Sequence, residues 1–177
     1  MNLPNKLTVA RIAMIPVFAV LALLPSTATD IGAAAVFALA AVTDILDGQI
    51  ARSRGLVTNF GKFADPLADK MLVATAMVVL LALGRLPAWV MIVILCRDFA
   101  VDGLRFIAAD KGVVIAASVW GKRKTASQMV MVLVLMLQSL FSGSWYDFLS
   151  GLMIGLSVAL TVYSGVDYLW KGRQYLQ

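Results

Sequence analysis

Long apolar runs separated by short polar segments make up most of this chain of 177 residues. Six runs each extend over about 18–25 residues, the length that an α-helix needs to cross roughly 30 Å of hydrocarbon. They cover residues 7–24, 31–52, 64–84, 87–108, 118–141 and 146–169. Their apolar residues neither alternate with polar ones nor keep to one stripe, so we expect lipid around them. The pattern predicts an all-α integral membrane protein in which one domain, residues 1–177, contains six transmembrane helices.

Residues near the ends of the runs give two further expectations. Pro66 is expected in the first turn of the third helix, where its missing N–H costs nothing. Aromatic residues at the run ends are expected to lie at the membrane–water interface: Trp89, Trp145, Tyr146, Tyr168 and Trp170.

Composition and charge narrow the class of protein and its partners. With 61% hydrophobic and 14% charged residues, the chain is not an ordinary soluble domain. The basic residues behind the net charge of +5 lie between the apolar runs, so we expect anionic lipids and phosphate substrates as partners, and no nucleic acid. They concentrate beside the N-terminus, in the second and fourth connections and after the last run. The positive-inside rule therefore predicts a protein of the cell membrane in which both termini and the second connection face the cytoplasm.

The second connection is flanked by four of the chain's ten aspartates: Asp44, Asp47, Asp65 and Asp69. At 100° per residue, the first two share one face of the second helix with three other residues: Gly48, Ala51 and Arg52. Asp65 and Asp69 lie one turn apart on the third helix. The loop between the helices is short, so we expect the four carboxylates to converge near the cytoplasmic boundary.

Four neighbouring carboxylates in a partly apolar site repel one another, so cations must neutralise them or some must be protonated. Oxygen ligands select hard ions such as Mg²⁺, Mn²⁺ or Ca²⁺, and a pair of divalent ions is a known clamp for phosphoryl transfer. The chain has no histidine, so an aspartate is the expected base. The alternative is that the aspartates only form ion pairs with nearby basic residues: Arg52, Arg54, Lys62 and Lys70.

The spacing Asp-x2-Asp-Gly-x2-Ala-Arg-x8-Gly-x3-Asp-x3-Asp over residues 44–69 resembles the signature of the CDP-alcohol phosphotransferase family, with all eight fixed positions matched. The resemblance implies a helical membrane fold, two divalent cations (Mg²⁺ or Mn²⁺) and a CDP-linked substrate. It also implies transfer of a substituted phosphoryl group to an alcohol, with release of CMP. A homodimer is expected by analogy with the family.

The resemblance also assigns roles by position. The four aspartates would hold the metals, and Asp69 would also be the general base on the acceptor hydroxyl. The CDP site would be lined by Gly48, Ala51, Arg52, Thr58 and Gly61. Asn5, Thr8 and Arg11 are further candidates near the entrance for the lipid-linked nucleotide, although helix capping explains Asn5 equally well.

Three segments, NLPNKLTVARI, NFGKFADPLADKMLVA and GKRKTASQM, are similar to bacterial members of the family that join CDP-diacylglycerol to sn-glycerol 3-phosphate. Such an acceptor needs a second anion site. The candidates are Arg97, Arg105, Lys122 and Lys124. Arg97 and Arg105 share an arc of the fourth helix with Asp98 and Asp102, and the lysines lie where the fifth helix begins.

Other interpretations stay open at this point. If no anion binds there, the arginines and aspartates of the fourth helix only neutralise one another, and the two lysines are ordinary flanking charge. The same chemistry with another alcohol, such as inositol phosphate, is an alternative. A cation channel or transporter with the aspartates along an ion path is a more distant one.

Overall fold

The computed structural model describes the backbone of residues 3–53, 59–113, 118–141 and 143–173. Within these ranges it also describes the side chains, except those of residues 3–4, 45–53, 59–60, 62 and 63. The described part is all-α, with one short 3-10 helix and no strand. Its helices are α1 (Leu3–Leu23), α2 (Thr27–Ser53), α3 (Asn59–Ala82), α4 (Ala88–Asp110), α5 (Val119–Met136), η1 (Leu137–Ser139) and α6 (Ser144–Gly172).

Each α-helix overlaps one predicted run, so the order and positions of the helices are confirmed. The ends differ: α3 begins at Asn59, and Pro66 lies inside the helix, so its predicted place in the first turn is wrong. An apolar run marks the part of a helix that lies in hydrocarbon, whereas backbone hydrogen bonding continues the helix through polar residues beyond it. The fifth helix is shorter than its run, because the chain tightens into η1 after Met136.

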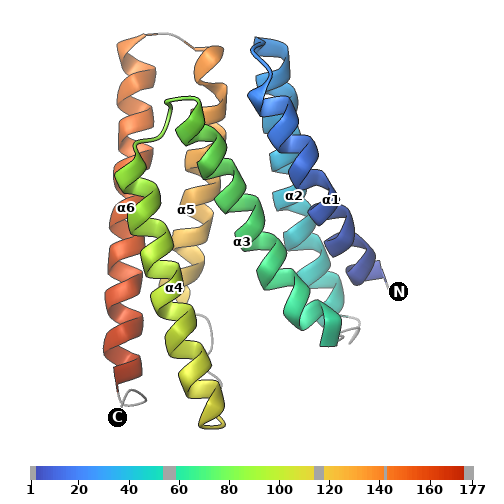
Figure 1. The fold of residues 1–177 in the computed structure, drawn as a ribbon, viewed down its shortest axis with the longest axis vertical. Coiled ribbons are helices and arrows are strands. Elements are labelled where there is room, and N and C mark those ends of the chain that lie inside the picture. Colours follow the sequence, from blue (N-terminus) through green and yellow to red (C-terminus); the bar gives the residue numbers. More distant parts are fainter. Residues whose placement is uncertain (1–2, 54–58, 114–117, 142, 174–177) are drawn as a thin grey trace. The chain divides into compact units, whose positions relative to one another are not determined.

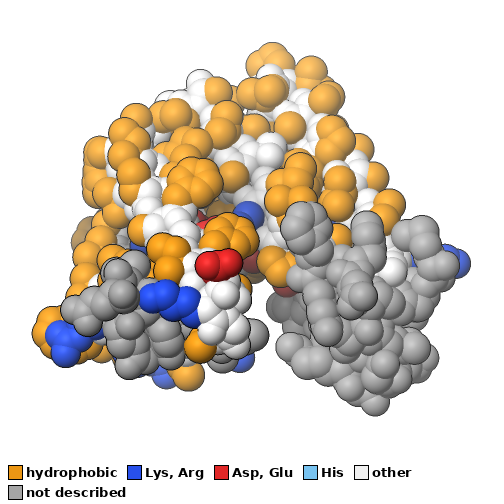
Figure 2. Space-filling model, turned by 60° about the horizontal axis from the view of Figure 1, so that its bottom comes forward, with side chains coloured by type: hydrophobic (Ala, Val, Ile, Leu, Met, Phe, Trp, Pro, Cys, Tyr) orange, Lys and Arg blue, Asp and Glu red, His pale blue; other side chains and the backbone are white. Residues whose placement is uncertain are grey.

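Within the described residues, three segments are long and apolar enough to cross a membrane: Asn5–Leu23, Thr27–Asp44 and Ser144–Gly172. The other three helices carry charged residues over part of their length, and their crossing of the bilayer stays a prediction. Large apolar side chains such as Phe99, Phe106 and Phe148 are more than 70% exposed. Figure 2 shows hydrophobic side chains over much of the described surface. Such a surface is typical of a membrane protein.

The chain divides into two compact units. Unit 1 is Met1–Arg85 with Val132–Gly143, and unit 2 is Leu86–Met131 with Ser144–Gln177. In unit 1, α1 packs along both α2 and α3 (Figure 1), and Phe18 and Phe37 meet at a ring distance of 5.7 Å with neither side chain exposed. In unit 2, α4 packs on α6 around Val101, Leu104 and Tyr168.

In unit 1, α3 ends in a turn that requires glycine. Gly84 has φ of 70°, a left-handed conformation that side chains disfavour. The Arg85 N–H donates to the Leu80 carbonyl at 2.9 Å, and the Gly84 N–H donates to the Leu81 carbonyl at 3.0 Å. This is the hydrogen-bond pattern of a Schellman cap, and it fixes the backbone from which the Arg85 side chain starts.

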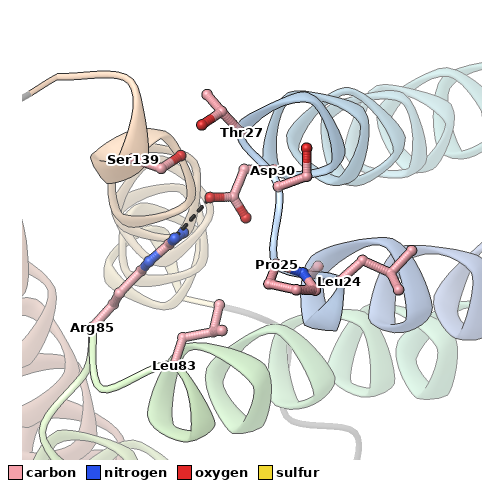
Figure 3. A pocket seen from close by; sticks show the side chains of 9 residues that line it. Leu24, Pro25, Thr27, Asp30, Leu83, Arg85 and Ser139 are labelled. Carbon is pink, nitrogen blue, oxygen red and sulfur yellow. Dashed lines mark hydrogen bonds and ion pairs between the residues drawn. The ribbon is translucent and has the colours of Figure 1, made fainter.

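Arg85 ties together three segments of unit 1 beside a pocket of about 240 Å³ (Figure 3). Its Nη2 donates to Asp30 Oδ2 at 2.7 Å, in the first turn of α2. Its Nη1 donates to the Met136 carbonyl at 3.0 Å, at the end of α5. The side chains of Arg85 and Asp30 are 18% and 6% exposed, so the ion pair is largely withdrawn from water.

We expect Arg85→Met to destabilise the protein by about 3 kcal/mol, because Asp30 would stay buried without its partner. The double variant Arg85→Met/Asp30→Leu should recover most of this loss, since neither charge then remains. Thermal unfolding of purified protein in detergent measures both. A double variant as unstable as the single one would contradict the importance of the pair.

Candidate active site

Helix α1 contributes two buried polar side chains that reach the aspartate segment from the side. Thr8 Oγ1 donates a hydrogen bond to Asp65 Oδ1 of α3 at 2.6 Å. Arg11, three residues later on α1, forms an ion pair with Asp44 of α2. Thr8 is 1% and Arg11 0% exposed, whereas the Asp44 side chain is 29% exposed, so the α1 partners are buried and the carboxylate of Asp44 stays partly accessible. The structure therefore brings α1, α2 and α3 together at two of the predicted metal-binding aspartates.

The other predicted residues of this site are described to different extents. Asp69 lies one turn after Asp65 on α3, and Gly61 is buried on the same helix. The side chains of four predicted residues on α2 lie outside the described part: Asp47, Gly48, Ala51 and Arg52. Thr58 lies outside the described residues altogether.

No three Asp, Glu, His or Cys side chains lie close enough together to hold a metal ion within the part of the chain that the structure describes. Asp44, Asp65 and Asp69 belong to that part, whereas Asp47 does not. The four-aspartate metal site therefore stays a prediction.

The chemistry of this donor set still fits divalent cations. The groups are carboxylates, the oxygen ligands that Mg²⁺ and Mn²⁺ prefer. Thr8 and Arg11 hydrogen-bond to two of them, as partners that orient metal ligands commonly do. Of these two α1 residues, the sequence suggested only a general place near the entrance for the lipid-linked nucleotide.

Unit 2 contains a second charged cluster, made of predicted acceptor-site residues and one aspartate. Lys124 Nζ lies 2.7 Å from both carboxylate oxygens of Asp98, and Arg97 Nη1 donates to Asp98 Oδ1 at 3.1 Å. Lys124 is only 4% exposed, which is unusual for a lysine used as ordinary flanking charge. Lys122 is exposed, so of the two predicted lysines only Lys124 is buried.

Helix α6 completes this cluster with residues that sequence reasoning did not select. Arg97 Nη2 donates to Ser164 Oγ at 3.0 Å, and Arg105 Nη2 donates to the Tyr168 hydroxyl at 2.6 Å. The interpretation of Tyr168 as an interfacial residue is wrong, since it is 4% exposed and packs inside unit 2. Tyr146 is equally buried, whereas Trp89, Trp145 and Trp170 are exposed. A polar pair spaced i,i+4 in an apolar run was the available signal for Ser164 and Tyr168.

Comparisons with known proteins identify the family of this chain. The family model described as CDP-alcohol phosphatidyltransferase matches residues 1–163. A protein of Bacillus subtilis (strain 168), named CDP-diacylglycerol–glycerol-3-phosphate 3-phosphatidyltransferase, is 42% identical over 189 residues, covering 99% of this chain and 97% of its own. A protein of the same name from Rickettsia bellii is 38% identical over 175 residues, covering 98% and 97%. A probable phosphatidylglycerophosphate synthase of Mycobacterium tuberculosis (strain H37Rv) is 41% identical over 172 residues, covering 95% and 80%. The chain belongs to the CDP-alcohol phosphatidyltransferase family.

Proposed function

We propose that this protein transfers the phosphatidyl group of CDP-diacylglycerol to sn-glycerol 3-phosphate, forming phosphatidylglycerophosphate and releasing CMP. The observation that carries the proposal is the family's aspartate motif, two of whose carboxylates contact α1, in a chain similar over its whole length to relatives named for this reaction. By analogy with the family, we expect a homodimer in the plasma membrane. The positive-inside pattern supports a site that faces the cytoplasm.

We expect Asp44, Asp47, Asp65 and Asp69 to hold two divalent cations, Mg²⁺ or Mn²⁺. The cations would supply neutralisation of the diphosphate and of the charge that develops on it during transfer. Thr8 and Arg11 hold two of the carboxylates in fixed orientations from α1. This preorganisation lowers the cost of assembling the site around an anionic substrate.

The CDP group would lie along the end of α2 and the start of α3. Gly48, Ala51 and Gly61 are small, so the nucleotide can approach the helix backbones, and Thr58 is a further candidate contact. Arg52 can bind the diphosphate through two parallel hydrogen bonds. The diacylglycerol chains would remain in the membrane against the exposed apolar side chains.

Asp69 would remove the proton from the primary hydroxyl of glycerol 3-phosphate. The resulting oxygen attacks the phosphorus that bears diacylglycerol, the bond from that phosphorus to the CMP oxygen breaks, and CMP leaves. Catalysis of this kind depends mainly on positioning and electrostatics. The acceptor's own phosphate would bind Arg97, Arg105, Lys122 and Lys124.

The direct test of the proposal is CMP release from CDP-diacylglycerol by purified protein with Mg²⁺. Glycerol 3-phosphate, inositol 1-phosphate and no acceptor are compared. Release that depends on glycerol 3-phosphate supports the proposal. Release only with another alcohol would be consistent with the aspartate mechanism but would contradict glycerol 3-phosphate as the acceptor. No release from folded protein would favour the alternative of a cation channel or transporter.

We predict that Asp69→Asn lowers turnover at least about a hundredfold, because the amide cannot accept the hydroxyl proton. Binding of CDP should be partly retained. Steady-state turnover and equilibrium binding of radiolabelled CDP measure the two effects. Near-normal turnover would exclude Asp69 as the base.

We predict that Lys122→Ala/Lys124→Ala raises the KM for glycerol 3-phosphate about tenfold and the KM for CDP-diacylglycerol much less, because charge-assisted hydrogen bonds to phosphate are lost. Arg123→Ala is the matched control. This residue lies between the two lysines, is exposed, and has its guanidinium carbon 4.7 Å from the centre of the Trp120 ring. Equal effects of the double variant on both KM values would argue against an acceptor-phosphate site there.

We predict that Thr8→Val raises the Mg²⁺ concentration for half-maximal activity by about 10- to 100-fold, because Asp65 loses an orienting hydrogen bond. Thr43→Val is the control, since the Thr43 hydroxyl donates to the Ala40 carbonyl of its own helix at 2.8 Å, one residue before Asp44. A Mg²⁺ titration of activity distinguishes the variants. The same Mg²⁺ requirement in Thr8→Val and wild type would exclude this role of Thr8.

A further inference from the structure

Two arginines of unit 2 converge on one aromatic side chain of α6. Arg105 Nη2 donates to the Tyr168 hydroxyl at 2.6 Å, and the guanidinium carbon of Arg105 lies 5.1 Å from the centre of the Tyr168 ring. The guanidinium carbon of Arg97 lies 5.9 Å from the same ring centre. Both distances lie within the range of cation–π attraction. Tyr168 therefore holds Arg105 by its hydroxyl and attracts both arginines by its ring.

Residues near Tyr168 on α6 position the Arg97 side chain. Ser164, one helical turn earlier, accepts a hydrogen bond from Arg97 Nη2 at 3.0 Å. Gly165 leaves room for the arginine, because a Cβ at this position would lie 2.9 Å from Arg97 Cγ. The Tyr168 ring is itself fixed by packing with Val101 and Leu104 of α4. One face of α6 thus offers the two arginines the Ser164 hydroxyl, the space beside Gly165 and the Tyr168 phenol.

Both guanidinium groups retain capacity for an anion. The Nε atoms of Arg97 and Arg105 are buried and make no hydrogen bond to any residue that the structure describes. A buried donor without an acceptor costs free energy, and a phosphate that approaches the guanidinium and draws this donor toward it recovers part of that cost. Arginine also loses side-chain entropy when it is ordered on a ligand, so a guanidinium that is already held in place binds phosphate more tightly.

We propose that Tyr168 is a positioning residue, which together with Ser164 holds Arg105 and Arg97 in the orientation that binds the phosphate of the acceptor. This inference rests on the proposed function, because it requires an anionic acceptor at these arginines. Tyr168 acts through the arginines and takes no part in the bond that forms or the bond that breaks. Its effect therefore belongs to acceptor binding.

The test compares Tyr168→Phe with wild type in the CMP-release assay. The substitution keeps the ring and removes the hydroxyl that holds Arg105. We expect the KM for glycerol 3-phosphate to rise about tenfold, the loss expected for one hydrogen bond to a charged group. The KM for CDP-diacylglycerol and kcat at saturating acceptor should not change. Inorganic phosphate, used as a competitor of glycerol 3-phosphate, should inhibit the variant about tenfold more weakly.

Tyr163→Phe is the matched control. Tyr163 lies on the same helix, is 53% exposed, and has its ring 4.6 Å from that of Trp120. Removal of its hydroxyl should leave both KM values and the phosphate inhibition as in wild type. If Tyr168→Phe does not fold, Ser164→Ala tests the same face of α6 through Arg97, and a smaller rise, about threefold, is expected in the acceptor KM alone.

The outcomes separate this inference from the function on which it rests. A wild-type protein that uses glycerol 3-phosphate, with an unchanged acceptor KM in Tyr168→Phe, overturns the positioning role and leaves the proposed function intact. An equal rise in the KM values of both substrates does the same, because it indicates general damage to the structure. A folded wild-type protein that releases no CMP with glycerol 3-phosphate overturns the proposed function and this inference with it.

Discussion

A carboxylate that leaves water for an apolar surrounding costs several kcal/mol unless a cation or a hydrogen-bond donor accompanies it. This constraint is met at three places where segments of this protein pack together. Asp30 pairs with Arg85, Asp44 pairs with Arg11, and Asp98 pairs with Lys124. Each pair joins segments that are distant in the sequence, so each also fixes a tertiary contact. The i,i+4 pair of Asp167 and Lys171 at the end of α6 is more exposed on its lysine side and adds little by comparison.

The same constraint connects the structure with its chemistry. Charged side chains gather in two places that suit phosphate chemistry, the aspartate segment of unit 1 and the arginine–lysine cluster of unit 2. We expect the motif aspartates beside α1 to serve divalent cations and a diphosphate, and the arginines and lysines held by α6 to serve a second phosphate. A reaction between a lipid-linked diphosphate and a phosphorylated alcohol needs both kinds of site. The proposed function assigns each cluster to one of the two substrates.

The positions of the helices could be predicted from the sequence because the thickness of a bilayer sets the length of each apolar run. The helix ends could not be predicted, since α3 already begins at Asn59, before the apolar run that starts at Ala64, and carries Pro66 inside it. The aspartates could be selected because their spacing is recorded along the chain. The side chains that hold them could not, since Thr8 and Asp65 are 57 residues apart and only the packing of α1 on α3 brings them together. Ser164 and Tyr168 could not be assigned to the charged cluster for the same reason, because their partners lie on α4, more than 60 residues earlier.

Binding of divalent cations by the motif aspartates can be measured as Mn²⁺ binding to the purified protein, followed by electron paramagnetic resonance. We expect two bound Mn²⁺ ions per chain in the presence of CDP. We also expect loss of binding in Asp65→Asn, while Asp147→Asn, on the first turn of α6, binds like wild type. An active wild-type protein that binds no Mn²⁺, or an Asp65→Asn variant that binds Mn²⁺ as wild type does, would contradict metal binding by the motif aspartates.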